Sequence, residues 1–110
     1  MRRRAGAGVA WGAGSGARRS APGSRVVLAV GVGGGGCQAC MAGDAVACRE
    51  GRPRVFGVGP DLQGGQAAAA AVPNADASLL RVPDGITPEQ AVLLTDILPT
   101  GWFGAEMADV

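Results

Sequence analysis

Apolar and polar positions along this chain predict a few short strands followed by one helical region. The run RVVLAV at 25–30 is rich in β-branched residues and follows a Pro22-Gly23 turn signal, which predicts a strand. A shorter strand signal lies in RPRVFGVGPDLQGG, and NADASLLRVPDG predicts a strand and then a turn. QAAAAAVP fits a helix by its alanines or a strand by its length and flanking turns, and Pro73 limits either element.

The clearest local pattern is a helix start near residue 87. Thr87 can serve as the N-cap, Pro88 occupies the first helical position, and Gln90 completes a capping box. An apolar face follows, formed by Ala91, Leu94, Ile97 and Leu98. We expect Pro99 and Gly101 to break or kink the helix before WFGAEMADV resumes it, and no Gly or Asn cap ends it.

Charge divides the 110 residues unevenly. Residues 1–25 hold six arginines and no acidic residue, whereas the remainder holds four arginines and nine acids. Residues 1–22 have too few large apolar side chains to bury a face, so we expect a disordered basic arm before a single domain at 23–110. Such an arm could contact nucleic acid or an anionic membrane. No aromatic interleaving or known nucleic-acid fold follows it, so a solvated tail or a misassigned start is favoured.

A targeting segment is not predicted. Residues 5–17 are mostly Gly and Ala, so they lack the apolar stretch of a signal peptide, and no stop-transfer segment follows. We therefore expect a cytoplasmic protein with no membrane partner and no nucleic-acid partner.

The stretch VVLAVGVGGGGCQACMAG at 26–43 allows two incompatible interpretations. As a dinucleotide cradle, it would use Gly31, Gly33 and Gly36 after a strand, with Glu50 as the acid that binds the ribose. However, a match of this kind means little in a chain with twenty glycines, and Gly43 would weaken the helix that a cradle requires.

The alternative is a zinc loop built on Cys37, Cys40 and Cys48. Their pattern, C-x-x-C-x-x-G-x-x-x-x-C, is more specific than a lone C-x-x-C. Three cysteines suit a metal or redox site better than a disulfide framework. A closed structural zinc site needs four ligands, and three are in view.

At these residues the sequence resembles the zinc-dependent medium-chain alcohol dehydrogenases, whose lobe reads C-G-x-C-x-x-C-x-x-G-x-x-x-x-C. GSRVV at 23–27 is similar to the family's G-D-R-V-V, GGQA at 64–67 to its G-G-x-A-E-Y, and residues 72–110 to the segment that leads to its cofactor domain. The resemblance selects the zinc lobe over the cradle. By the family's spacing, the first lobe cysteine would stand at residue 34, where this sequence has Gly34. The fourth zinc ligand could then be a water molecule, Asp44 or Glu50; alternatively, no metal binds and the three cysteines are free thiols.

The resemblance implies a mainly β fold with short helices: a partial GroES-like domain with a zinc-lobe loop, the Rossmann domain missing. It implies zinc and NAD or NADP as cofactors, and hydride transfer between the nicotinamide and a small alcohol or aldehyde. Asp96 in LLTDILPTG matches a ligand of the catalytic zinc, and Thr100 matches a position against the nicotinamide ring. The matching cysteine and histidine ligands are missing, since the sequence has no histidine and its cysteines belong to the lobe.

Three hypotheses follow. The chain is a fragment or decayed copy of such a dehydrogenase, inactive in isolation. Alternatively it is a stand-alone zinc-binding or subunit-interaction module without catalysis, which could form a homo-oligomer. A third hypothesis is a truncated reading frame without a selected function.

Overall fold

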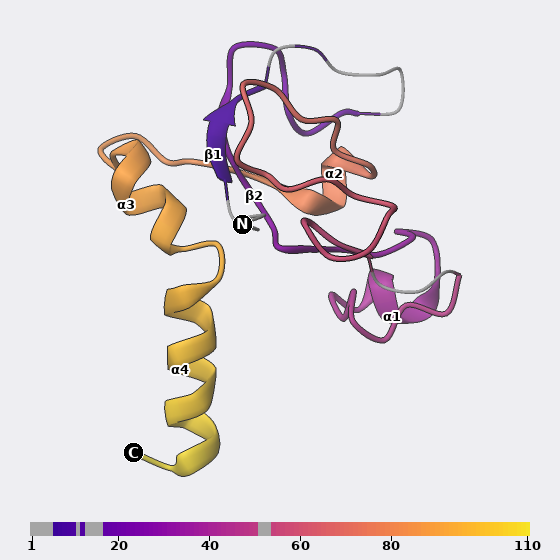
Figure 1. Cartoon of the computed structure of the whole chain (residues 1–110). Coiled ribbons are helices and arrows are strands. Elements are labelled where there is room, and N and C mark those ends of the chain that lie inside the picture. The colour runs from indigo at the N-terminus through magenta and orange to yellow at the C-terminus, as the bar shows by residue number, and fades with distance from the viewer. Residues whose placement is uncertain (1–5, 11, 13–16, 51–53) are drawn as a thin grey trace.

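The computed structural model describes residues 6–10, 12, 17–50 and 54–110, with a three-stranded antiparallel sheet at the centre (Figure 1). Strand β2 (Arg25–Leu28) lies between β1 (Gly6–Val9) and β5 (Leu79–Arg81). Leu28 pairs with Gly6 on one side and Leu79 on the other, which defines the register. The strands predicted at 25–30 and within 74–85 are confirmed in these shorter forms, as is the expected combination of short strands and helices.

The central strand is covered on both faces. Neighbouring side chains of a strand point to opposite faces of the sheet. Val27 therefore packs against Val82 and Ala91, with Ile86 beside them. Leu28 packs in a second cluster with Val32, Phe56 and Leu62. The sheet thus separates two small cores, and the second core supports the segment that carries the cysteines.

A second, two-stranded sheet forms the base of the cysteine segment. It pairs β3 (Gly31–Val32) with β4 (Arg54–Val55), and the short helix α1 (Gln38–Met41) lies between them in sequence. Val32 and Phe56 are almost fully buried where this sheet meets the second core. The weak strand signal after residue 52 and the helical turn in CQACMAGDAVAC are both confirmed.

The basic arm is partly ordered, which corrects the expectation of disorder over 1–22. Gly6–Val9 form β1, and the backbone N–H groups of Arg18 and Arg19 donate to the Asp76 carboxylate at 2.8–2.9 Å. Residues 1–5, 11 and 13–16 lie outside the described residues. The prediction was wrong for β1 because pairing with β2 uses backbone groups and needs no large side chains.

The alanine-rich segment forms neither of the two predicted elements. Residues 66–71 run as exposed, irregular chain, and the alanines at 67–71 line a cavity of about 610 Å³ together with β1 and β2. Helix α2 (Ala75–Ser78) follows, at a place where the sequence predicted strand. It begins after Asn74, whose left-handed backbone (φ 48°) turns the chain, and the Ser78 hydroxyl donates to the Pro73 carbonyl.

The capping box at residue 87 is confirmed at the start of α3 (Pro88–Leu93). The Gln90 N–H donates to the Thr87 hydroxyl at 3.3 Å, and the Thr87 N–H donates to the Gln90 side chain at 3.0 Å. On the other side of this loop, the Arg25 guanidinium donates to the carbonyls of Ile86 and Pro83. These contacts connect α3 to the central sheet.

The break in the C-terminal helical region lies at residues 94–96, before α4 (Ile97–Ala108), which corrects the prediction of a break at Pro99. Pro99 is the third residue of α4, where a backbone N–H would have no partner within the helix, so the ring is tolerated. The helix ends on Asp109 in the left-handed conformation, so it does not continue to the last residue.

Figure 1 shows α4 projecting away from the sheet. No helix among the described residues combines the length and apolar character needed to cross a membrane.

Candidate metal centre

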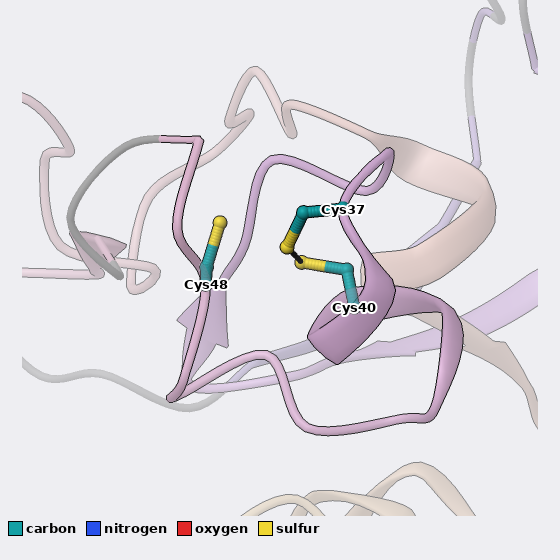
Figure 2. A group of neighbouring side chains, drawn as sticks. All are labelled: Cys37, Cys40 and Cys48. Atoms are coloured by element: carbon teal, nitrogen blue, oxygen red, sulfur yellow. Dashed lines mark hydrogen bonds between the residues drawn. The ribbon is translucent and has the colours of Figure 1, made fainter.

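Helix α1 positions two of the three thiols. Cys37 is the N-cap, Cys40 lies three residues later on the same side, and their Sγ atoms are in hydrogen-bonding contact at 3.6 Å (Figure 2). The helix ends after one turn because Gly43 has a left-handed backbone (φ 90°). The Gly43 N–H donates to the Cys40 carbonyl and the Asp44 N–H to the Ala39 carbonyl, a Schellman pattern. Gly43 therefore ends the turn that presents both sulfurs.

Cys48 approaches the pair from the returning loop (Figure 2). Its Sγ accepts a hydrogen bond from the Gly34 N–H at 3.1 Å, and the three Sγ atoms all lie within 4.8 Å of one another. A tetrahedral zinc ion with Zn–S bonds of about 2.3 Å requires sulfurs about 3.8 Å apart. The three thiols fit such an ion after small side-chain adjustments. The structure thus brings together all three cysteines that the sequence predicted as ligands, and their occupancy by zinc stays a prediction.

The glycine run before Cys37 allows the backbone to approach the sulfurs closely. A Cβ atom at position 33 would lie 2.8 Å from the Cys40 Sγ, which is too close for any side chain without displacing the thiol. The Asn74 side-chain amide donates to the carbonyls of Gly33 and Gly34 at 2.6 and 2.8 Å. Sequence reasoning missed this role of Asn74, because the contact joins residues about forty positions apart.

The environment of the paired thiols gives them different acidities. The backbone N–H groups of Arg49 and Cys40 lower the pKa of the Cys37 thiol to about 6. For Cys40, the backbone N–H of Gly35 lowers the pKa, but desolvation and the neighbouring thiols of Cys48 and Cys37 outweigh it, so the pKa is raised. Cys37 is therefore largely a thiolate near neutral pH, the form that binds a metal.

The alternative cradle for a dinucleotide has no counterpart in this geometry. The glycines lead from a two-residue strand into a four-residue helix whose N-cap is a cysteine. A cradle needs a longer strand and a helix that begins directly at the glycines. The glycine run instead forms one wall of the thiol cluster, as the zinc-loop interpretation requires.

Asp96 and Thr100 lie elsewhere, at the start of α4, a helix that Figure 1 shows well apart from α1. Asp96 is half-buried at the N-cap, and its Oδ1 accepts a hydrogen bond from the exposed Thr100 hydroxyl at 3.4 Å. Across the described part of the chain, Asp96 does not belong to any group of three potential metal ligands; the cysteines alone form one. The roles of Asp96 as a catalytic ligand and Thr100 as a cofactor contact stay predictions.

A family match and individual relatives both point to the family that the sequence resembles. The family described as alcohol dehydrogenase GroES-like domain matches residues 4–84. A probable zinc-binding alcohol dehydrogenase of Mycobacterium tuberculosis is 48% identical over 88 residues, which cover 80% of this chain and 22% of that protein. Zinc-type alcohol dehydrogenase B of Aspergillus flavus is 36% identical over 95 residues, covering 86% and 22%.

A solved structure agrees with these relatives. The alcohol dehydrogenase TADH from Thermus sp. ATN1 superposes with a TM-score of 0.85 at 30% identity, over 94% of this chain and 30% of that one. The chain therefore spans about a fifth of the length of these curated relatives. The match also begins within the segment expected to be a disordered arm, consistent with the observed β1 strand.

Proposed function

Because the chain belongs to the alcohol dehydrogenase GroES-like domain family, we propose that it is a GroES-like part of a zinc-dependent alcohol dehydrogenase whose cysteine lobe binds one structural zinc ion. The observation that carries this proposal is the convergence of Cys37, Cys40 and Cys48 within 4.8 Å. Zinc bound there would connect α1 to the returning loop. Most of the folding energy of so small a lobe would then come from the metal.

The reaction of such a dehydrogenase is hydride transfer between a small alcohol or aldehyde and NAD or NADP. In that reaction a catalytic zinc polarises the substrate oxygen. Asp96 would hold that ion and Thr100 would contact the nicotinamide. These 110 residues contain no histidine, and their three cysteines lie in the lobe, so Asp96 has no second ligand of the expected type here. We therefore expect this chain alone, acting in the cytoplasm, to bind zinc without turning over alcohols.

The test combines metal uptake with an activity assay on the purified chain. Zinc titration should give one ion per chain, and a panel of alcohols with NAD or NADP should give no turnover. Cys-independent or absent zinc uptake would overturn the zinc proposal. Turnover that disappears in Asp96→Ala would overturn the proposed inactivity.

A second candidate function, subunit interaction between copies of this chain, is favoured by the surface of α4. Large apolar side chains are exposed there: Ile97, Leu98, Trp102, Phe103 and Met107. Large apolar side chains exposed together on one helix are typical of a surface that binds another protein. Sedimentation velocity should show concentration-dependent dimers that Trp102→Ser with Phe103→Ser abolishes and Glu106→Gln preserves. A monomer at all concentrations would exclude this function.

A further inference from the structure

We propose that the Glu50 carboxylate supplies the fourth metal ligand of the lobe, in place of the cysteine that Gly34 lacks. The inference rests on the proposed zinc binding and names the residue that completes the site. Three thiolates and one carboxylate carry the same formal charge as four thiolates. Carboxylate oxygen is an established zinc ligand, with bonds of about 2.0–2.2 Å.

The position of Gly34 supports this assignment. A Cβ atom at residue 34 would lie 3.3 Å from the Cys48 Sγ and 3.5 Å from Glu50 Oε2. A side chain at residue 34 would therefore point at the thiol cluster, as a fourth ligand must. The Glu50 carboxylate borders position 34 as well, although its oxygens lie outside the group of ligand atoms that are within 4.8 Å of one another, so the side chain has to turn toward the sulfurs to bind the ion.

Gly36 shows where the carboxylate lies. A Cβ atom at residue 36 would lie only 2.9 Å from Glu50 Oε2 and 3.6 Å from Oε1. The carboxylate therefore lies over the glycine run, and it can do so because residue 36 has no side chain. Neither Gly34 nor Gly36 has a left-handed backbone, so glycine is not required there for backbone geometry. At position 36, the carboxylate is the group that a side chain would displace.

The other acidic residue of the lobe, Asp44, is already engaged. Its Oδ1 accepts a hydrogen bond from the Ala47 N–H at 3.1 Å, which stabilises the turn that follows α1. The described residues contain no hydrogen bond or ion pair to the Glu50 carboxylate. Among the described residues, turning Glu50 toward a metal ion breaks no hydrogen bond or ion pair, whereas Asp44 would lose its bond to the Ala47 N–H.

The experiment measures zinc affinity by competition with a chromophoric chelator, in the full chain. Glu50→Gln should weaken zinc binding by about 10-fold or more. The matched control Asp44→Asn should change it by less than about 3-fold. The spectrum of the Co²⁺-loaded chain, a readout independent of activity, should shift from a tetrahedral pattern in the wild type when Glu50 is replaced.

Two further variants distinguish loss of a ligand from misfolding of the lobe. Gly34→Cys introduced into Glu50→Gln should restore affinity and strengthen the thiolate-to-cobalt absorption. Gly36→Ala, which displaces the carboxylate but keeps Glu50, should weaken zinc binding in the wild type and have no effect in Glu50→Gln.

Equal zinc affinity in the wild type and Glu50→Gln would overturn the assignment of Glu50, and so would loss of affinity in Asp44→Asn alone. Both results would leave the zinc proposal standing. A wild-type chain that binds no zinc would instead overturn the proposed function itself, so the two failures are distinguishable.

Discussion

The cysteine lobe and the C-terminal helices each carry residues that the sequence predicts as metal ligands, but within the described chain only the lobe brings such residues together. Three sulfurs converge within 4.8 Å around α1. Asp96, at the start of α4, has the Thr100 hydroxyl as a hydrogen-bond partner, and no group of three potential ligands includes it within the described chain.

The difference follows from how far apart in sequence the required groups lie. The lobe takes its three thiols from twelve consecutive residues, so one helical turn and one returning loop are enough to assemble them. The predicted catalytic site would need a cysteine and a histidine from elsewhere, and residue 96 alone cannot supply them. The lobe therefore assembles a candidate metal site, whereas α4 contributes a single predicted ligand.

Removal of one thiol should have the largest effect on this comparison. Cys48→Ser should weaken zinc binding by more than about 100-fold, because loss of a direct ligand exceeds the loss of an outer contact. Asp96→Ala, the matched change in the other region, should leave zinc affinity unchanged. Competition titrations of both variants check this, and a weaker zinc affinity in Asp96→Ala would mean that the two regions are not independent.

A change in the wall of the lobe should have an intermediate effect. Gly33→Ala places a methyl group 2.8 Å from the Cys40 Sγ and should weaken zinc binding by about 10-fold. Gly31→Ala is the control, since its methyl group would lie 3.9 Å from the nearest neighbour, the Arg54 carbonyl. Comparable losses in both variants would show that the effect comes from the backbone and not from the sulfur.

The capping box of α3 should contribute to stability, unlike the exposed positions of α4. Thr87→Ala removes the acceptor for the Gln90 N–H and should lower the free energy of unfolding by about 1 kcal/mol. Thr100→Ala, at an exposed site on α4, should change it by less than about 0.5 kcal/mol. Urea unfolding measures both, and a larger loss at Thr100 would indicate that α4 is packed in solution.

The smallest effect on stability should come from the hydrogen bonds between the N-terminal segment and Asp76 of α2. The backbone N–H groups of Arg19 and Arg18 hold the pKa of the Asp76 carboxyl below its usual range. A lowered pKa in the folded state stabilises the fold above the unfolded-state pKa, about 3.9, and this contribution is lost as the pH falls through the folded value. Asp76→Asn should therefore show a smaller fall in melting temperature on acidification below about pH 4. An unchanged pH dependence would contradict this contact.

Sequence patterns predicted the elements that rest on local chemistry. The strand at 25–28, the capping box at Thr87 and the cysteine spacing all depend on neighbouring residues, and the structure contains each of them. The predicted position of the break in the last helical region was wrong. Proline usually ends a helix, but Pro99 lies in the first turn of α4, where proline is tolerated.

Features that depend on distant residues were missed. Strand β1 has only small side chains and one valine, and it exists through its pairing with β2. The bracing of the glycine run by Asn74 joins α2 to the lobe across about forty residues. A single sequence carries no local signal for either contact, because both are made with the backbone of a distant segment.

The most direct test of the contrast between the two regions is the zinc stoichiometry of the purified chain by native mass spectrometry. We expect one ion per chain, retained in Asp96→Ala and lost in Cys40→Ser. A chain that binds no zinc, or binds it equally well after Cys40→Ser, would contradict the claim that the cysteine lobe is the metal site.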